Sequence, residues 1–480
     1  MFLASMEDPL QTVLSTIAFF ALASLAVRVV HMRFLHPLRR FPGPWLQSIS
    51  KIPTALDLLR ANQPMVMRKL HEKYGLIVRL APNELSSIDA DAWEAIFGSP
   101  KNGPNFEKSE LFIGAVNPLN GSVGISLAPN EIHTRQRKAL AAPFTKKALL
   151  QQECILQRHV DKFIAAMKTM DTFVTFDMIG DICFAEPFGC LDTGASIEWA
   201  ASLCNIFKSA TGSLLHKILL KLIVPADAAR WRQVHFQNSK EKTMRRLADP
   251  DRDHPDLIKH ILDNEDSRKA LTETEIVLNM VLFISASSET PANRITGWTY
   301  FMLRNPAKLA RATAEVRSAF ATAQEIRWEG VKNLKYLDST IHEALRLLSP
   351  DAANQMRVVP PGGATVCGHF LPGGTTAGIA PRRVRAGALA RRRRRRALRR
   401  RPPPRVAGLQ RRARGCIGKD LAWMEMRLIL SGLLWHFDLA LDEERPAARA
   451  ALRKWDEFDI ESYATWMKPD LWVRMKEAER

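Results

Sequence analysis

A single cysteine with glycines beside it, placed just before an amphipathic helix, is the feature that most constrains this chain. Cys416 lies between Gly415 and Gly418, and the pattern of residues 421–437 predicts a helix that starts near Lys419. The glycines let a large planar ligand approach the backbone, and the positive end of the helix favours the thiolate over the thiol. A thiolate in such a place can bind a haem iron as an axial ligand and favour O–O cleavage. A buried structural cysteine is the alternative that this stretch leaves open.

The bulk composition is that of a globular protein with reduced thiols. The chain has 480 residues, of which 46% are hydrophobic and 25% are charged. Its six cysteines show no paired spacing, no CxxC and no metal-ligand cluster. This pattern favours reduced, cytosol-facing thiols over a disulfide framework.

The positive charge of the chain is concentrated in one segment. The formal charge is +19, but residues 382–414 hold sixteen arginines and no acid, so that the remainder carries only +3. The basic character therefore belongs to this segment and not to a binding face spread through the fold.

Residues 377–413 do not fit the pattern of the rest of the chain. Arg391–Arg396 are consecutive arginines and Pro402–Pro404 are consecutive prolines, so the segment cannot bury enough apolar area to offset its ordering entropy. A patch for nucleic acid or acidic lipid is one interpretation, but residues 371–422 contain no aromatic side chain on which bases could stack. We favour a compensated frameshift or gene-model error. A transcript that encodes the run Arg391–Arg396 would refute this hypothesis.

The N-terminal residues 1–32 are interpreted as a membrane anchor. Leu10–Val27 is an uncharged, mostly apolar stretch of 18 residues, at the short end of what spans a bilayer. Glu7 and Asp8 precede it and four arginines follow it within residues 28–40, so the positive-inside bias puts the C-terminal bulk in the cytosol. A cleaved signal peptide is the alternative, but the basic residues lie on the wrong side for it.

Behind the anchor we expect a hinge and one mainly helical domain. Residues 33–48 are proline-rich and predict a stiff, extended hinge rather than a helix. Within the domain, residues 49–480, the stretches 76–89 and 356–376 have strand and turn character. Residues 130–350 are mostly helical, with apolar side chains at spacings of three and four. The expected fold is mainly α with a small sheet near each end of the sequence.

Glu343 and Arg346 form a second motif, about 70 residues before Cys416. Their i, i+3 spacing brings the carboxylate and the guanidinium onto one face of a helix. Alone, the pair could equally be an ordinary surface ion pair worth a few tenths of a kcal/mol.

The third motif is a long helix predicted over residues 273–302. Thr272 and Glu275 form a capping box at its start. Pro291 lies inside the helix and should open it at Glu289 and Thr290, whose carboxyl and hydroxyl groups could hold water and relay protons. A kink in a buried helix with solvated polar residues is the alternative.

The fourth motif is the basic run His133–Lys138. Its cations would suit an anionic group such as a propionate or a phosphate. A solvated basic helix face is the alternative.

Together these four motifs resemble the cytochrome P-450 family of haem-thiolate monooxygenases, and the resemblance covers nearly the whole chain. Residues 177–189 and 81–85 are similar to fungal microsomal members, such as the group around isotrichodermin hydroxylases. The positions that match the family's motifs are His133, Arg137, residues 286–291, Glu343, Arg346, Arg357, Arg414, Cys416 and Gly418.

The resemblance implies a mainly-α fold with a small β part, a haem, and a role for each matched residue. Cys416 would bind the haem iron, with Gly418 in its loop, and Thr290 and Glu289 would deliver protons to dioxygen. Glu343 and Arg346 would hold the core near the loop. His133, Arg137, Arg357 and Arg414 are the residues expected to contact the haem propionates.

The loop before Cys416 departs from the family pattern. Leu409 and Arg412 stand where the family usually has Phe and Gly, and residues 377–412 lack the upstream arginine that completes a network with the Glu343–Arg346 pair. Glu343 would then be a buried charge without a partner, which is costly. Ser287 and Pro291 are milder departures.

The resemblance further implies hydroxylation of a small lipophilic metabolite in secondary metabolism, with dioxygen and electrons from a membrane-bound, NADPH-dependent flavoprotein reductase. We expect a single-pass protein of the endoplasmic reticulum with its domain in the cytosol and no nucleic-acid partner. Two alternatives remain: an inactive relative that cannot hold haem, and a membrane-tethered binder of nucleic acid or anionic lipid through residues 382–414.

Overall fold

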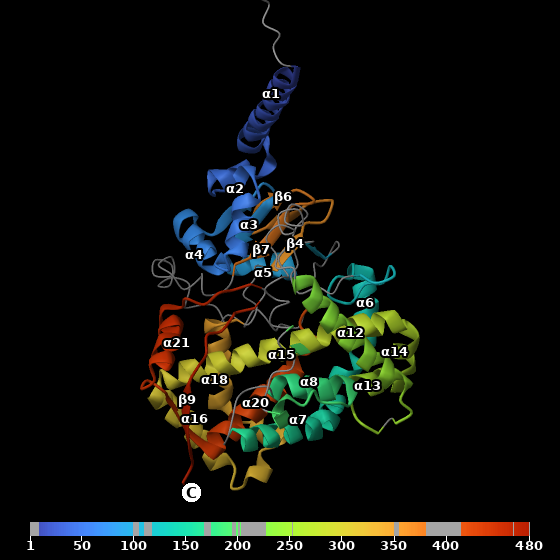
Figure 1. Ribbon diagram of the computed structural model, residues 1–480, viewed down its shortest axis with the longest axis vertical. Helices are drawn as coiled ribbons and strands as arrows, with labels where there is room; N and C mark the ends of the chain where they lie inside the picture. The colour runs from blue at the N-terminus through green and yellow to red at the C-terminus, as the bar shows by residue number, and fades with distance from the viewer. Residues whose placement is uncertain are drawn as a thin grey trace, which may run out of the picture.

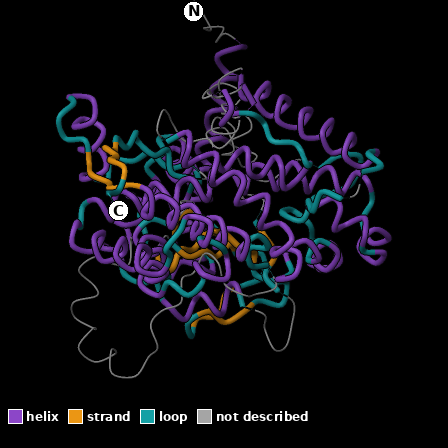
Figure 2. Tube along the Cα trace, turned by 90° about the horizontal axis from the view of Figure 1, so that it is seen from below, coloured by secondary structure: helices purple, strands orange, loops and turns teal. Residues whose placement is uncertain are grey.

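The computed structural model describes residues 9–98, 105–109, 118–167, 174–193, 198–199, 202, 227–251, 253–349, 355–380, 414–463 and 465–479. Helices form most of this part of the chain, and the strands lie in small groups (Figure 2). The predicted start of the anomalous segment 377–413 is wrong, because its first residues belong to the strand β7, Thr376–Ile379. Residues 381–413 lie outside the described residues, so the hypothesis of a frameshift there stays a hypothesis.

A long apolar helix stands clear of the body at the N-terminal end of the described chain (Figure 1). α1 spans Pro9–Val30 and continues as a π-helical turn over His31–Leu35. Within the described residues, Gln11–Leu35 is the one helix that is long and apolar enough to cross a membrane, and none of its most apolar window is buried in the body. The apolar helix thus extends beyond the predicted end of the anchor at residue 32.

The extended conformation predicted for the proline-rich hinge is wrong. Pro37–Arg40 forms a 3-10 turn and Trp45–Ile49 forms the short helix α2, so extended backbone is limited to His36 and to residues between these two elements. Pro37 occupies the first position of its turn and Pro44 caps α2. Proline suits the start of a helical turn because the N–H that it lacks has no partner there.

The two strand regions of the sequence form one sheet, which corrects the prediction of a separate small sheet near each end. Its five strands lie in the order β1-β2-β7-β4-β3, and the β2–β7 pair is parallel. Two small antiparallel pairs, β5–β6 and β8–β9, complete the strands of the described chain. The bounds are β1 Ile77–Ala81, β2 Glu84–Ser87, β3 Glu107–Lys108, β4 Gln355–Val358, β5 Ala364–Val366, β6 His369–Leu371, β7 Thr376–Ile379, β8 Phe437–Leu441 and β9 Val473–Glu477.

The sheet and the first short helices lie between α1 and the helical body (Figure 1). The helices on this side are α3 Ile52–Leu59, α4 Gln63–Tyr74 and α5 Ala90–Phe97. The helical body contains α6 Asn130–Ala139, α7 Lys146–Ala166, α8 Val174–Phe184, α9 Cys190–Thr193, α12 Asp227–Ala248, α13 Leu257–Asp263, α14 Glu265–Ala270, α15 Glu273–Leu303, α16 Pro306–Ala319, α17 Trp328–Val331, α18 Lys335–Leu347, α20 Lys419–His436 and α21 Pro446–Glu457.

α15 is the central helix of the body and agrees with the prediction for residues 273–302. The predicted capping box is confirmed, because the Thr272 side chain accepts from the Glu275 backbone N–H and the Glu275 carboxylate accepts from that of Thr272. Most of α15 is buried, and it packs against α8 and α12. Burial on nearly all sides explains how a helix of 31 residues remains ordered.

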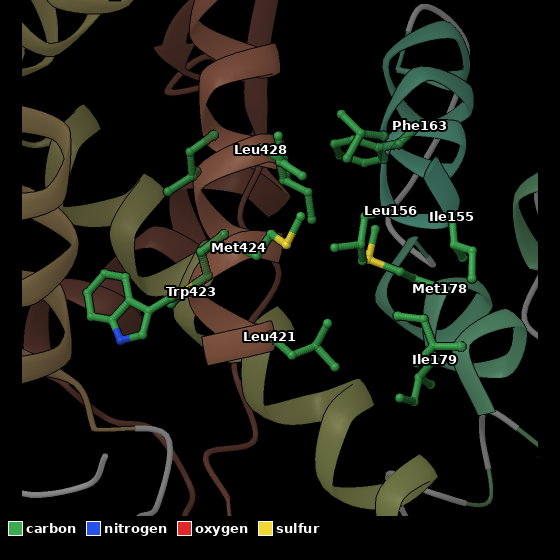
Figure 3. Packing of buried hydrophobic residues seen from close by; sticks show 14 of the residues in the cluster. Ile155, Leu156, Phe163, Met178, Ile179, Leu421, Trp423, Met424 and Leu428 are labelled. Carbon is green, nitrogen blue, oxygen red and sulfur yellow. The ribbon is translucent and has the colours of Figure 1, made fainter. Parts of the chain in front are cut away.

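The main hydrophobic core joins α20 to α7 and α8. In Figure 3, Leu421, Met424 and Leu428 of α20 point toward Leu156 of α7 and Met178 of α8. Each of these five residues is at most 2% exposed, so the burial of each side chain contributes about 1.5–3 kcal/mol. This core fixes the start of α20, and with it the loop that carries Cys416.

Candidate active site

Cys416 lies in the loop directly before α20, as predicted. Its side chain is accessible to solvent, yet burial raises the pKa of the thiol. The charge of Arg294, the Gly418 backbone N–H and the charge of Arg137 oppose this rise without overcoming it.

The sequence predicted that the start of the helix favours the thiolate of Cys416, and the structure agrees with this only in part. The Gly418 N–H at the start of α20 does bond to the sulfur and lowers the pKa, but burial raises it by more. A bound metal would select the thiolate nevertheless, because thiols bind metals in their deprotonated form.

The middle of α15 opens toward solvent at one face. Ala286 is exposed and Thr290 is half-buried, although Ser285, Ser288 and Pro291 around them are buried. The Thr290 hydroxyl donates to the Ala286 carbonyl oxygen at 2.6 Å. The helix runs unbroken through Pro291, so the predicted opening of the helix at Glu289 and Thr290 is wrong. Because proline has no N–H, one backbone hydrogen bond of this turn is missing. The Thr290 hydroxyl donates to a neighbouring backbone carbonyl in the same turn.

Glu289 is held from two sides. Its Oε2 accepts a hydrogen bond from Lys468 Nζ at 3.2 Å and one from Asn293 Nδ2 at 3.4 Å. The Glu289 side chain is 19% exposed, so this ion pair is partly shielded from water. The acid beside Thr290 is thus a carboxylate with a fixed position on the helix.

The four residues predicted to contact propionates lie together. Burial, together with the charges of Arg414, Lys108, Arg137 and Arg357, lowers the pKa of His133 to about 3. His133 is therefore neutral and can donate a hydrogen bond, while the cations around it create a positive field. The cations come from α6, β3, β4 and the Cys416 loop, which are far apart in the sequence.

Arg137 and Arg414 connect this positive cluster to the Cys416 loop. Arg137 donates to the carbonyl oxygen of Gly415. Arg414 donates at 2.9 Å each to Glu107 Oε2, to the Asn130 side chain and to the Ala128 carbonyl. Its Nη1 atom is buried and has no hydrogen-bond partner within the described structure.

Arg357 is buried on β4, where its guanidinium donates to its neighbouring carbonyl, that of Met356, at 3.2 Å. The guanidinium also lies over the ring of Phe97, 5.0 Å from the centroid. Such stacking holds the guanidinium of Arg357 in place.

The other basic residues of the fourth motif do not join the cluster. Arg135 pairs with Glu275 of α15 at 2.5 Å, and Lys138 is exposed. This separation of roles follows from the helical period, because Arg135 lies on a different face of α6 from His133 and Arg137.

Glu343 and Arg346 form a two-pronged ion pair on α18, with both N–O distances at 2.7 Å. Their side chains are 56% and 41% exposed, respectively. The predicted contact of Glu343 and Arg346 on one helix face is confirmed, whereas the predicted burial of Glu343 is wrong because its carboxylate faces water.

Two buried charges near Cys416 were missed by the sequence analysis. Arg294, four residues after Thr290 on α15, is 8% exposed, and its Nε atom has no hydrogen-bond partner among the described residues. Glu425 of α20 is 1% exposed, and burial raises its pKa to about 8 although Arg294 opposes the rise. The available signal was a charged residue inside the apolar pattern of each helix.

These groups suit a haem. Cys416 supplies a reachable sulfur, and the cluster around His133 supplies positive charge with a buried, unsatisfied Arg414 donor, as two propionates require. The described residues contain no cluster of three or more His, Cys, Asp or Glu side chains that could hold a bare metal ion.

Comparison with known proteins agrees with this chemistry. Residues 40–385 match the cytochrome P-450 family model, a match that includes α15 and Arg357 and ends before Cys416. The chain is 56% identical to cytochrome P-450 monooxygenase ABA2 of Pyricularia oryzae (strain 70-15) over 97% of this chain and 96% of that protein.

Two more distant relatives also match over nearly their full length. The identity is 38% to cytochrome P-450 monooxygenase abl2 of Leptosphaeria maculans, over 97% of this chain and 92% of that protein. It is 32% to averantin hydroxylase of Dothistroma septosporum, over 93% of this chain and 88% of that protein. The chain therefore belongs to the cytochrome P-450 family of haem-thiolate monooxygenases.

Proposed function

We propose that this protein hydroxylates a small lipophilic metabolite in fungal secondary metabolism. The support is its membership of the monooxygenase family together with its identity to fungal relatives, one of which is named averantin hydroxylase. A hydroxylation of this type follows R–H + O₂ + 2e⁻ + 2H⁺ → R–OH + H₂O. The protein must therefore hold the haem, admit two electrons and deliver two protons per turnover.

The haem would be held between the Cys416 loop and the positive cluster. When bound, the haem supplies the oxygen-activating chemistry, which is the cofactor's own. Cys416 would bind the iron, and Gly418 would hold the sulfur through its backbone N–H. The propionates would be bound by His133, Arg137, Arg357 and Arg414.

Thr290 and Glu289 would deliver the protons. Because the Thr290 hydroxyl donates to the Ala286 carbonyl, its oxygen can accept a hydrogen bond from water on the open face of the helix. The neighbouring Glu289 carboxylate can take up protons from solvent and pass them on through water. Glu343 and Arg346, which stabilise the last turn of α18, would support the body of the site.

Electrons would come from a membrane-bound, NADPH-dependent flavoprotein reductase. The apolar helix Gln11–Leu35 would anchor the protein in the endoplasmic reticulum, with the domain in the cytosol beside the reductase. The arginines that follow the helix support this orientation.

One observation carries the proposal: four cations from separate chain segments converge on His133, and one of them, Arg137, also bonds to the loop of Cys416. A surface patch for nucleic acid would spread such charges over an exposed face, whereas His133 is 5% exposed.

The proposed reaction can be tested by isotope incorporation. Full-length protein in membranes with its reductase and NADPH is incubated with averantin and with an extract of lipophilic fungal metabolites under ¹⁸O₂. We expect a product that is heavier by one ¹⁸O atom and that is absent with Cys416→Ser. Incorporation from H₂¹⁸O in place of ¹⁸O₂, or no product from any of these substrates, would contradict the proposed function.

A further inference from the structure

A strap near the C-terminal end of the described chain reaches the middle of α15. We define the strap as residues 460–463 and 465–469. It is tied down by three hydrogen bonds to distant elements. Ser462 N–H donates to Ala61 at 2.8 Å, Trp466 Nε1 donates to Ser349 at 2.6 Å, and Trp455 Nε1 donates to Pro469 at 3.2 Å. The strap therefore has a fixed path across the body.

The fixed strap positions Lys468 at Glu289. Lys468 follows Trp466 by two residues, and the Trp466 ring is 5% exposed, so the backbone that carries Lys468 is anchored close by. The Lys468 and Glu289 side chains are 28% and 19% exposed, respectively. Reduced exposure strengthens an ion pair relative to a surface pair, because water screens the charges less.

Glutamate needs such a restraint to act as a proton relay. Its side chain has three rotatable bonds, so a solvated carboxylate samples many positions. Lys468 and Asn293 both bind the same Oε2 atom of Glu289, at 3.2 Å and 3.4 Å. Their combined effect is to restrain the carboxylate of Glu289, the residue that precedes Thr290 on α15.

We propose that Lys468 is a positioning residue for proton delivery: it restrains the carboxylate of Glu289, which precedes Thr290 on α15, so that protons arrive while the reduced oxygen is still in the site. This inference rests on the proposed function. Productive turnover follows R–H + O₂ + NADPH + H⁺ → R–OH + H₂O + NADP⁺. When protons arrive late or at the wrong oxygen atom, reduced oxygen escapes as O₂ + NADPH + H⁺ → H₂O₂ + NADP⁺.

The test measures how much hydrogen peroxide is released per NADPH oxidised. It uses full-length, haem-loaded protein in membranes with its reductase. The measurement is made once without added substrate and once with averantin as the probe. For Lys468→Gln we expect the peroxide yield to rise about threefold or more, a fraction of what loss of a direct acid–base group costs. Lys468→Arg should stay near the wild-type yield, because it keeps the charge.

Matched variants separate this effect from a loss of folding. Lys476→Gln removes an exposed lysine of β9 that pairs with Glu479, and it should leave the yield unchanged. Lys468→Met keeps the apolar stem and serves as a second variant if Lys468→Gln does not fold. In a Glu289→Gln background, Lys468→Gln should raise the yield no further, because the partner is already gone.

A second readout does not depend on turnover. In haem-loaded protein, the shifts in melting temperature of Lys468→Gln, Glu289→Gln and the double variant should be non-additive, as expected for two residues in contact. Additive shifts, or a peroxide yield in Lys468→Gln that equals that of Lys476→Gln, would overturn the inference. A wild-type protein without a thiolate-type carbon monoxide spectrum would instead overturn the proposed function itself.

Discussion

The two sides of the candidate haem site are anchored in different ways. The α15 side is secured near both ends of one helix, by the Thr272–Glu275 capping box and by the bond from Trp298 Nε1 to Thr340 at 2.9 Å. The Cys416 side is a short loop that depends on Arg137 from α6 and on contacts of Arg414 to residues near β3 and α6. The backbone of the helix is set mainly by its own hydrogen bonds and cap, whereas the loop needs distant residues to hold its backbone.

The largest expected effect is on the core that both sides share. Leu428→Ala should destabilise the protein by about 2–5 kcal/mol, because it leaves a cavity between α20 and α7 where Leu428 is 0% exposed. Chemical denaturation in detergent, followed by circular dichroism, measures this cost. Leu150→Ala on α7, at a position 38% exposed, is the control and should cost much less.

The next effect should single out the Cys416 side. Arg414→Gln should cost about 2 kcal/mol, because it removes charge-assisted hydrogen bonds from a side chain that is 8% exposed. The fraction of protein that retains haem on a desalting column should also be lower in Arg414→Gln than in wild type. Arg445→Gln removes an arginine that is 67% exposed and should change neither quantity. Equal losses in the two variants would show that the loop does not depend on Arg414.

The pH dependence of the unfolding free energy tests the role of Glu425, the buried acid of α20 near Arg294 of α15. Burial raises the pKa of Glu425 to about 8, so the folded protein retains a proton that the unfolded chain loses above about pH 4.5. Its contribution to stability is therefore fully present below the unfolded pKa and is lost as pH rises toward about 8. The unfolding free energy should decline over this window in wild type, and Glu425→Gln should flatten the decline. Parallel curves for the two proteins would refute this assignment.

The smallest effect should fall on the contact between α6 and α15. Arg135→Gln should cost about 1 kcal/mol, since its partner Glu275 is buried but Arg135 itself is 43% exposed and screened by water. The hydrogen bonds to Glu275 outweigh burial and lower its pKa to about 2, so this stability is present above about pH 4.5 and is lost as pH falls toward about 2. The exposed pair Arg68–Glu72 provides the control, Arg68→Gln, which should cost less at every pH.

Elements whose signals are local were predicted well. The helix expected at 273–302 was found at Glu273–Leu303, and the one expected near Lys419 begins there. In both cases a start signal and an apolar pattern lie within a few residues of each other. The strand regions 76–89 and 356–376 were also recognised, because their turns are marked by proline, asparagine and glycine.

Features that depend on distant partners were not predictable. The ion pair of Lys468 with Glu289 joins residues 179 positions apart, and no local pattern records it. The pairing of β2 with β7 in one sheet was missed for the same reason. The hinge was predicted wrongly because proline both prevents helix interiors and starts helical turns, and sequence alone did not distinguish the two at Pro37.

The central claim is that Cys416 binds the haem iron, and its most direct test is the absorption spectrum of reduced, haem-loaded, full-length protein under carbon monoxide. We expect a thiolate-type shift of the main haem band in wild type and in Cys367→Ser, where the replaced cysteine lies between β5 and β6 and packs against the hydrophobic cluster of the sheet. Cys416→Ser should lose the shift. No shift in wild type, or a shift that persists in Cys416→Ser, would contradict the claim.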